Sequence, residues 1–324
     1  MDRLVVAIAA VAAVVTSGVV YVTVGERILG LLPQNGRRAA RPWLWLAPAL
    51  ASVVAFLVLP TVNTVLLSVR NPSTGAWIGL AHYASVLGDP SVQVALRNNL
   101  LWIVVFPTAV VLLGLTIALL TDQVRYERVA QAVVFLPMAI SFVAAGVIWR
   151  LMYEFRPPPL PQTGTLNAFL MFVAPGFDPH AWLIDNPPWN NLALIVAAAW
   201  VWTGFCMVVL SAALKGVPSE IREAARVDGA TELQAVRFVV IPMLGDTIAV
   251  VATTMVIFAL KAFDIVYVMT NGNYETEVIA NRMYKEMFTV RDFGHASALA
   301  VVLLLAVVPA IALNLRRFRQ QGAR

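Results

Sequence analysis

Charged residues are scarce in this sequence of 324 residues: Asp, Glu, Lys and Arg make up only 13% of it, whereas hydrophobic residues make up 60%. The mean hydropathy is +0.79. A soluble domain needs a polar exterior, and one soluble core cannot bury this much apolar surface. The composition therefore excludes an ordinary soluble protein and indicates that lipid is the solvent.

Cysteine and histidine are also rare, and a phosphate-binding loop is missing. Cys206 is the single cysteine, so no internal disulfide can form. Histidine occurs only at His82, His180 and His295, without metal-ligand spacing. No GxxxxGKS or GxxxxGKT segment occurs in the chain. We therefore expect this chain to bind no metal, cofactor or nucleotide of its own and to have no catalytic centre.

Long apolar runs dominate the rest of the sequence. Each is about 20 residues or longer, which is enough for a helix to cross a hydrocarbon core of roughly 30 Å. Seven such runs lie at 4–24, 43–67, 98–121, 130–152, 191–214, 246–270 and 296–315. Helices are expected because lipid cannot satisfy free backbone groups, and no run alternates as a barrel strand does. The sequence predicts an all-α polytopic membrane protein with a six-helix core and one extra N-terminal transmembrane helix.

The net charge of +5 reflects topology rather than nucleic-acid binding, because the basic residues lie in short loops between apolar runs. Fourteen Lys and Arg residues lie on one side, in 25–42, 122–129, 215–245 and 316–324, and eight lie on the other. The more basic side is expected to be cytoplasmic, which places the N-terminus outside and the C-terminus inside. Cleavage of 1–24 as a signal peptide is the alternative, but it would invert every later loop against this distribution.

These runs and loops predict a division of the chain into four parts. We expect an N-terminal transmembrane helix with a basic cytoplasmic linker at 1–42, a first core helix with an external loop at 43–97, the rest of the transmembrane core at 98–315, and a basic cytoplasmic tail at 316–324.

The cytoplasmic segment 215–245 is unusually polar for this chain and carries signals for two short helices. Ser219 can cap the first helix, and Gly229 can end it in a left-handed conformation. Thr231 and Gln234 have the spacing of a capping box for the second helix, which we expect to end before Pro242. Small residues and charges share the first helix, a combination that allows close approach by a partner surface.

This segment resembles the EAA loop of binding-protein-dependent ABC importer permeases. The family pattern is EAA, three residues, Gly, nine residues and then I-x-L-P, and it is matched with two conservative changes, Val239 for Ile and Ile241 for Leu. An extended form, E-A-A-x-x-D-G-A, is similar to the sugar-importing branch. The residues that match these patterns are Glu223, Ala224, Ala225, Asp228, Gly229, Ala230 and Pro242.

Weaker resemblances extend from about residue 40 to residue 315. The segment KAFDIVYVMT at 261–270 is similar to the end of the second-last helix in maltose-type and glycerol-phosphate-type permeases, and 41–60 is similar to their opening helix. The extra helix at 4–24 and VIANRMYKEMF at 278–288 are similar to alpha-glucoside permeases. The resemblance therefore points to import of a sugar, with an alpha-glucoside or another oligosaccharide as the best candidate.

The resemblance also implies a set of partners and a mechanism. It implies a second permease subunit, two cytoplasmic ATPase subunits that bind ATP, an external solute-binding protein and surrounding lipid, with no nucleic acid. Each permease subunit would dock its EAA helix into a cleft on an ATPase subunit. Glu223 would make the docking salt bridge, Gly229 would form the turn and Asp228 would accept backbone hydrogen bonds there. The permease subunit itself would then be non-catalytic.

Four residues are candidates for the substrate path, because a sugar site combines aromatic faces with amide, hydroxyl or carboxylate groups. They are Asn99, Trp202, Thr203 and Asp264. Membrane anchoring is an alternative role for any of the tryptophans. For Asp264 the alternative is an ion pair with Lys261 on the same helix face, which would lower the cost of burying both charges.

Two other functions stay open at this point. One is an ABC permease for another small polar solute, such as a polyol or glycerol phosphate. The other is an ion-coupled secondary transporter, which would need a carboxylate in mid-membrane, and only Asp264 lies well inside an expected helix.

Overall fold

The computed structural model describes residues 2–122, 124–184 and 187–321, except for the side chains of 2–4, 10, 11, 14, 15 and 313–321. Within these ranges the regular elements are helical, and the one β-bridge is an isolated pairing of Arg70 with Trp77. The chain forms two compact units, residues 1–66 and residues 67–324.

The first unit is a pair of helices with a short loop between them. It contains α1 (Asp2–Gly30), α2 (Gln34–Val53), the π-helical segment η1 (Val54–Val58) and α3 (Leu59–Ser68), which runs across the unit boundary. Glu26 of α1 accepts hydrogen bonds from Arg41 Nε (2.8 Å) and Trp45 Nε1 (3.2 Å) of α2. The hydrogen bond from Arg41 is the main reason why the pKa of Glu26 lies below its usual range.

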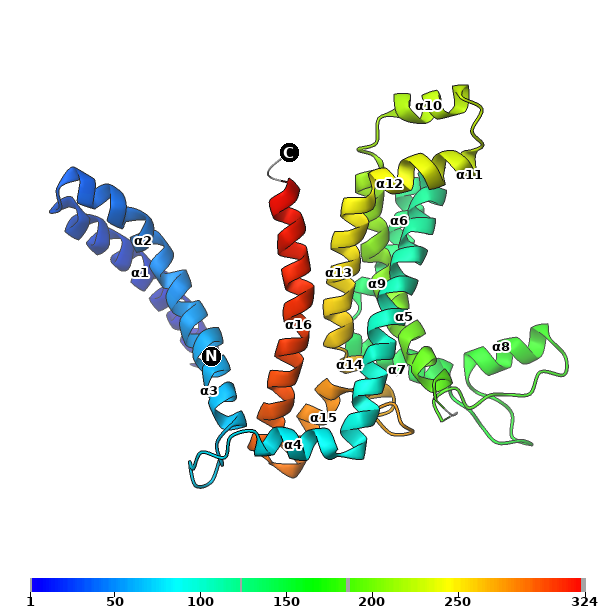
Figure 1. Cartoon of the computed structure of the whole chain (residues 1–324), viewed down its shortest axis with the longest axis horizontal. Helices are drawn as coiled ribbons and strands as arrows, with labels where there is room; N and C mark the ends of the chain where they lie inside the picture. The colour runs from blue at the N-terminus through cyan, green and yellow to red at the C-terminus, as the bar shows by residue number, and fades with distance from the viewer. Residues whose placement is uncertain (1, 123, 185–186, 322–324) are drawn as a thin grey trace. The chain divides into compact units, whose positions relative to one another are not determined.

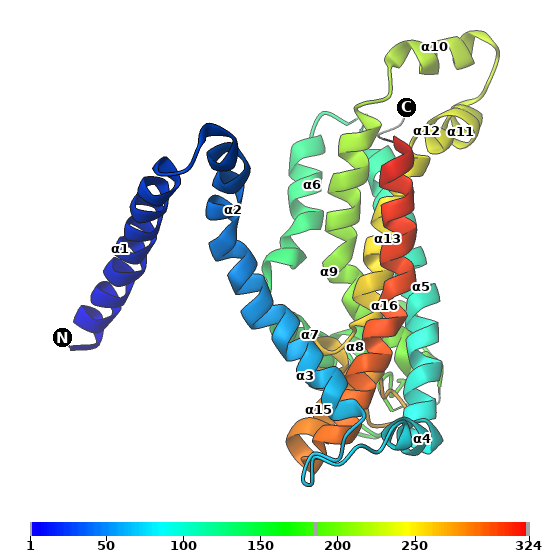
Figure 2. The ribbon, with the colours of Figure 1, turned by 60° about the vertical axis from the view of Figure 1, so that its left-hand side comes forward.

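The second unit is a helical bundle, seen from two sides in Figures 1 and 2. Its elements, in chain order, are α4 (Ala81–Gly88), α5 (Pro90–Thr121), α6 (Glu127–Phe135), η2 (Leu136–Ala139), α7 (Phe142–Met152), α8 (Thr165–Val173), α9 (Trp189–Leu214), α10 (Ser219–Val227), α11 (Glu232–Ala235), η3 (Val236–Val240), α12 (Ile241–Met243), α13 (Gly245–Leu260), α14 (Asp264–Met269), α15 (Ile279–Lys285), η4 (Glu286–Val290) and α16 (Phe293–Gln321).

The predicted six-helix core is confirmed. Within the described residues, four helices are long and apolar enough to cross a membrane: Gln34–Ser68, Pro90–Thr121, Trp189–Leu214 and Phe293–Ala312. Two bent pairs bring the number to six if each pair is one span: Glu127–Ala139 with Phe142–Met152 at 99°, and Glu232–Met243 with Gly245–Leu260 at 70°. The seventh predicted span, 4–24, lies within the helix α1, and its passage through a membrane stays a prediction.

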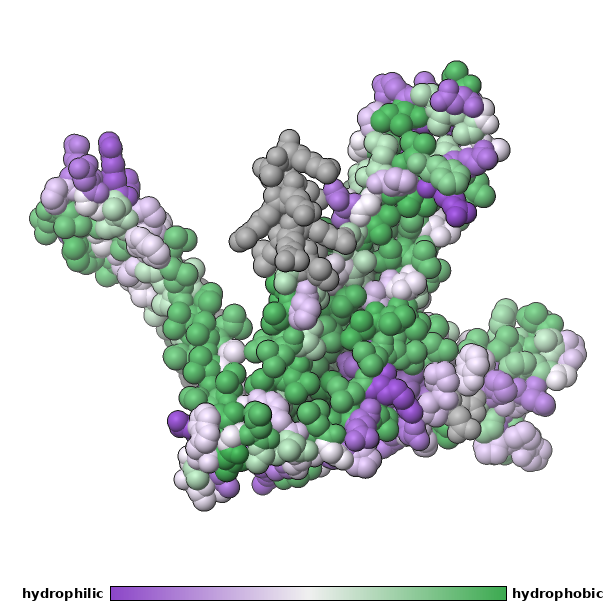
Figure 3. Space-filling model, in the orientation of Figure 1, coloured by the Kyte–Doolittle hydropathy of each residue, from purple (hydrophilic) through white to green (hydrophobic). Residues whose placement is uncertain are grey.

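The first of these bends, between η2 and α7, follows from the local sequence. Pro137 stands in the 3-10 segment η2, and Ser141 then caps α7 by accepting a hydrogen bond from the Ala144 N–H at 3.2 Å. On the face of the second unit seen in Figure 3, apolar side chains predominate between its two ends, where polar side chains gather. This distribution matches a bundle that crosses a bilayer.

Glycines let α9 approach its neighbours closely. A Cβ built on Gly114 of α5 would lie 2.7 Å from Cys206 Cβ and 2.9 Å from the Met207 nitrogen of α9. A Cβ on Gly204 of α9 would lie 2.6 Å from the Val134 carbonyl oxygen of α6. Small residues at such points bring helix backbones together where lipid provides no hydrophobic drive for association. The helices α5, α6 and α9 therefore form the tightly packed centre of the unit.

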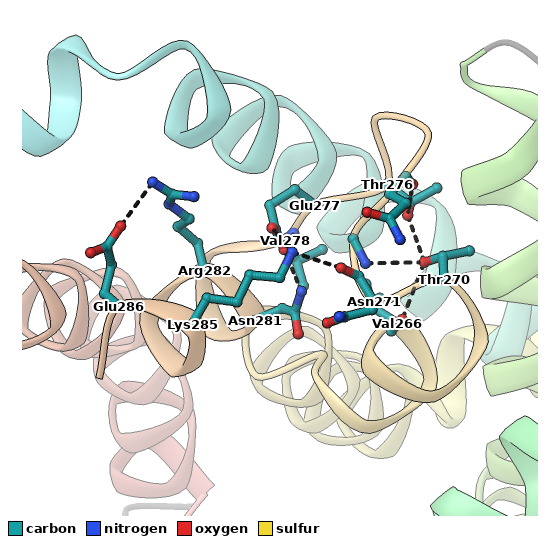
Figure 4. Close-up of polar contacts among 12 residues, drawn as sticks. Val266, Thr270, Asn271, Thr276, Glu277, Val278, Asn281, Arg282, Lys285 and Glu286 are labelled. Atoms are coloured by element: carbon teal, nitrogen blue, oxygen red, sulfur yellow. Dashed lines mark hydrogen bonds and ion pairs between the residues drawn. The ribbon is translucent and has the colours of Figure 1, made fainter. Parts of the chain in front are cut away.

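A buried polar network fixes the segment between α14 and α15 (Figure 4). The Glu277 carboxylate, 8% exposed, accepts hydrogen bonds from Lys285 Nζ at 2.7 Å and Asn281 Nδ2 at 2.5 Å. Asn98 of α5 donates to the carbonyl oxygens of Glu275 (2.7 Å) and Glu277 (2.8 Å). Because all but the Asn281 Oδ1 of these buried groups are paired among the described residues, these contacts hold this end of the bundle in one arrangement.

Candidate functional site

The two short helices of segment 215–245 lie at one end of the second unit, and α4 and α15 lie at the opposite end (Figures 1 and 2). The last helix, α16, runs from the α4 and α15 end toward the α10 end. The EAA residues and the end of α16 are thus on the same side of the bundle.

The first short helix, α10, ends in a Schellman motif. Gly229 has φ +83°, in the left-handed region predicted for it. Its N–H donates to the Arg226 carbonyl, and the Ala230 N–H donates to the Ala225 carbonyl, both at 3.0 Å. These two bonds satisfy the last carbonyl groups of α10 and reverse the chain direction.

Two details of the predicted loop are wrong. Ser219 is the first residue of α10, and Pro218 occupies the capping position without a side-chain hydrogen bond. The Asp228 N–H donates to the Ala224 carbonyl at 2.9 Å, but its carboxylate accepts no hydrogen bond from the described residues and lies exposed. The backbone of the Schellman motif already satisfies this turn, so no acceptor is needed from Asp228.

The second short helix begins as predicted and ends later. Thr231 and Gln234 form a complete capping box at the start of α11. The helical path then continues through η3 and past Pro242 to Met243, because proline is tolerated in the first turn of α12. The Pro242 side chain is exposed, and the sharp bend follows at Leu244.

Much of the surface of α10 is exposed, although Arg222 and Arg226 pair with residues outside the helix. None of its residues is buried, and Val227 is 87% exposed. Glu223 and Ala224 are exposed, Ala225 is half-buried, and the Glu223 carboxylate takes part in no ion pair or hydrogen bond with the described residues. An apolar and acidic surface of this kind is suited to a protein partner that brings a matching base.

The Arg226 side chain forms its ion pair within the segment 215–245, so it is not available to a partner protein. Its Nε donates to Glu232 Oε1 at 2.6 Å. This hydrogen bond, with a smaller electrostatic contribution from Glu223, raises the pKa of the Arg226 guanidinium further above its already high value. Arg226 therefore ties α10 to α11, while Glu223, like Glu220 and Asp228, stays exposed.

A cavity of about 170 Å³ lies within the bundle, beside the break between α13 and α14. It is lined by Trp102, Phe106, Phe142, Ala198, Trp202, Phe258, Lys261, Ala262, Phe263, Asp264 and Ile265. Two of the four predicted substrate residues, Trp202 and Asp264, meet here. Trp202 is only 8% exposed, because Phe142 and Phe258 pack on its ring at centroid distances of 5.7 and 3.9 Å.

The cavity is also lined by Trp102, which the sequence did not single out. Trp102 is 2% exposed, and its Nε1 has no hydrogen-bond partner among the described residues. A buried donor without an acceptor is costly, so a shift of the Trp102 ring that brings its Nε1 to a ligand oxygen would be favourable. Apolar runs contain many tryptophans, and only the fold shows which indole nitrogen is unpaired.

The predicted ion pair between Lys261 and Asp264 on one helix face is wrong. The helix α13 ends at Leu260, and α14 begins at Asp264, so the two residues flank a break instead of sharing a helix. Both side chains are exposed. Both residues lie in the described part of the chain, and no ion pair joins them there. They contribute two separate charges to the cavity wall.

The other two predicted substrate residues are engaged elsewhere. Asn99 is 3% exposed; its Oδ1 accepts from the Ile279 N–H at 2.8 Å and its Nδ2 donates to the Leu260 carbonyl at 3.4 Å. Thr203 donates to the Ala199 carbonyl of its own helix at 2.7 Å and does not line this cavity. The structure therefore brings together Trp202 and Asp264, with Lys261 and Trp102, and leaves Asn99 and Thr203 outside the site.

Comparison with known protein families identifies the family of this chain. The family described as binding-protein-dependent transport system inner membrane component matches residues 110–321, more than half of the chain. The chain belongs to this family. The expected permease fold is thereby confirmed, and the permease is a multi-pass protein of the inner membrane.

Individual relatives agree with this assignment. The permease is 50% identical over 278 residues to the osmoprotective compounds uptake permease protein GgtC of Synechocystis sp., covering 86% of this chain and 99% of the relative. It is 44% identical over 283 residues to the alpha-glucoside transport system permease protein AglF of Rhizobium meliloti, covering 87% and 83%. A solved bacterial ABC transporter that imports the acidic polysaccharide alginate has a chain with 26% identity and a TM-score of 0.71, covering 88% of this chain and 99% of that one.

Proposed function

We propose that this permease translocates a sugar, an alpha-glucoside or another oligosaccharide, across the cytoplasmic membrane in an ATP-driven importer. The cavity beside the α13–α14 break carries this proposal: its walls combine two charges of opposite sign with aromatic side chains, one of which, Trp102, has an indole N–H without a partner among the described residues. A neutral sugar offers apolar CH faces and a rim of hydroxyl groups that fit such walls. The alpha-glucoside permease of Rhizobium meliloti, 44% identical, supports the same substrate class.

The roles of the partner subunits of the importer are part of this proposal. A second permease subunit completes the pore, an external binding protein delivers the sugar, and two cytoplasmic ATPase subunits bind and hydrolyse ATP. This chain is then non-catalytic and binds no cofactor. Its exposed α10 docks on one ATPase subunit, with Glu223 as the charged contact and Gly229 holding the turn.

A second substrate class has an observation in its favour. The relative that is 50% identical takes up osmoprotective compounds. A small polar solute such as a polyol would use the same hydrogen-bonding groups of the cavity but would need less aromatic surface.

Uptake measurements separate these substrates. In cells that carry the complete transport system, we expect ATP-dependent uptake of radiolabelled maltose or trehalose and none of glycerol 3-phosphate or an amino acid. A Trp102→Phe variant should lower kcat/KM for the sugar by roughly fivefold, because one hydrogen bond of about 1 kcal/mol is lost.

Trp149 supplies the matched control for this experiment. Its Nε1 is also buried without a partner, but Trp149 does not line the cavity. Trp149→Phe should therefore leave sugar kinetics unchanged. Uptake of glycerol 3-phosphate or the amino acid in place of both disaccharides would overturn the sugar assignment, and equal losses in the two variants would remove the cavity from the substrate path.

The proposed orientation places the N-terminus outside and both α10 and the end of α16 in the cytoplasm. The excess of basic residues on the α10 side supports it. A cysteine at position 34 should react with a membrane-impermeant reagent only after the membrane is opened, whereas one at position 160, where Leu160 is 56% exposed, should react in intact cells. Labelling of position 34 from outside would show that the inverted topology is correct.

A further inference from the structure

The helix α10 has no apolar anchor in the bundle. None of its side chains is buried, and it lies beyond the ends of the long helices (Figure 1). Hydrophobic packing therefore cannot hold this helix in one orientation against the membrane part. Polar contacts must do so, and Arg222 makes those that reach the long helices.

The guanidinium of Arg222 joins α10 to the ends of two membrane helices. Its Nη1 lies 2.9 Å from Asp122 Oδ2, next to the end of α5, and its Nη2 donates to the carbonyl oxygen of Leu214, the last residue of α9, at 3.3 Å. The side chains of Arg222 and Asp122 are only 25% and 17% exposed. This partial burial makes the pair stronger and less sensitive to salt than an ordinary surface ion pair.

The position of Asp122 is not favourable for α5 by itself. Asp122 stands at the C-cap of α5, where the helix dipole disfavours a negative charge. The Leu214 carbonyl is one of the last-turn acceptors of α9, which have no intrahelical partner. Arg222 compensates the charge of Asp122 and adds a second hydrogen bond to the Leu214 carbonyl, which also accepts from the Val217 N–H at 3.1 Å.

The two helices that Arg222 contacts also form the cavity. Trp102 and Phe106 of α5 and Ala198 and Trp202 of α9 line it. The close approach at Gly114 locks α5 to α9 along their length. A displacement of α10 is therefore passed to both helices as one rigid body, provided that the contact with Arg222 holds.

We propose that the Arg222–Asp122 pair is the strut that transmits movement of α10 to α5 and α9 during the transport cycle. This inference rests on the proposed docking of α10 on an ATPase subunit. Arg222 is a positioning residue: it contacts neither the sugar nor ATP, and it fixes the angle between the docked helix and the bundle. Without the pair, α10 can still dock on the ATPase subunit, but its movement is no longer transmitted to α5 and α9.

A neighbouring ion pair provides a matched control. Lys215 Nζ lies 2.5 Å from Glu127 Oε1 and joins the end of α9 to the start of α6 on the same side of the bundle. It does not involve α10. Loss of this pair removes a similar charge contact without breaking the proposed strut.

The test uses the complete importer reconstituted in proteoliposomes with maltose as the probe. For Arg222→Met and Asp122→Asn we expect co-purification of the ATPase subunits within about twofold of wild type, but roughly tenfold less maltose transported per ATP hydrolysed. The exchanged double variant Arg222→Asp with Asp122→Arg should recover most of the lost coupling, since the attraction is restored. Lys215→Met should couple as wild type does.

A second measurement does not depend on the substrate. Spin labels at Val227 of α10 and Leu120 of α5, which are 87% and 68% exposed, report the distance between the two helices in the assembled complex. We expect one narrow distance distribution with and without ATP in wild type, and a broad or ATP-dependent one in Arg222→Met.

The outcomes distinguish the strut from the proposed function. Normal coupling and an unchanged distance distribution in Arg222→Met would overturn the strut while leaving the importer intact. Failure of the double variant to recover, together with equal damage from Lys215→Met, would show that the pair only supports folding. Absence of maltose transport in wild type would show that maltose is not the substrate, and the distance measurement would still decide the strut.

Discussion

Glu223→Lys is expected to abolish transport and to detach the ATPase subunits. The Glu223 side chain is exposed on α10 and has no partner among the described residues, so the change costs the fold little. In the proposed docked state, a like or unpaired charge at a tight interface costs on the order of 2 to 5 kcal/mol. That corresponds to at least roughly 30-fold weaker docking. Co-purification of the ATPase and ATP-dependent uptake measure the two effects separately.

Glu220→Lys is the control for this result. Glu220 lies one turn earlier on the same helix, is also exposed and also carries a negative charge in the first turn. Its replacement changes the net charge by the same amount and also removes a favourable first-turn charge, but it lies outside the EAA positions. Full transport and normal ATPase recruitment in Glu223→Lys would remove α10 from its proposed role, and equal loss in both variants would point to a general charge effect.

The arrangement of the membrane part could be predicted well from the sequence. Apolar runs of sufficient length located four core spans directly and the other two if each bent helix pair is one span, although the run at 246–270 breaks after Leu260. Local signals were equally reliable in the loop: the left-handed Gly229 and the capping box of Thr231 and Gln234 depend on residues a few positions apart. These are features that a short stretch of chain decides by itself.

Features that depend on distant parts of the chain could not be predicted. The break after Leu260 lies inside one apolar run, so hydropathy gives no sign of it, and it separates Lys261 from Asp264. Asn99 is a candidate for the substrate path by sequence, but its amide is used by the Ile279 N–H, 180 residues away in the chain. The unpaired donor of Trp102 is visible only once every neighbour of the indole is known.

The roles of individual arginine and lysine residues could not be predicted from the sequence either. The sequence places Arg222 among several charges of α10 with nothing to single it out. Only the meeting of Asp122 and Leu214 at the ends of two separate helices gives this side chain its specific role. Charge patterning therefore predicts the side of the membrane, whereas the pairing of individual charges comes from packing.

Gly229→Val should reduce ATPase recruitment and transport strongly, through the backbone alone. A Cβ at residue 229 would meet no atom within 4 Å, so the substitution creates no clash. The cost comes from φ +83°, which a β-branched residue adopts only with strain of about 1 to 3 kcal/mol. The substituted valine would relieve this strain by leaving the left-handed region, which breaks both hydrogen bonds of the Schellman motif and leaves only the Arg226–Glu232 pair described above to orient α10 against α11.

Gly229→Asn separates conformation from size, because asparagine is larger than glycine and still tolerates the left-handed region. We expect Gly229→Asn to keep most of the uptake and Gly229→Val to lose roughly 5- to 150-fold, the factor that corresponds to the backbone strain. Uptake of a labelled disaccharide and co-purification of the ATPase subunits, measured in parallel for both variants, give the comparison. Equal activity of the valine and asparagine variants would mean that the turn after α10 is free to change shape without uncoupling the importer, and the docking geometry would then have to be set by Arg222 and Arg226 alone.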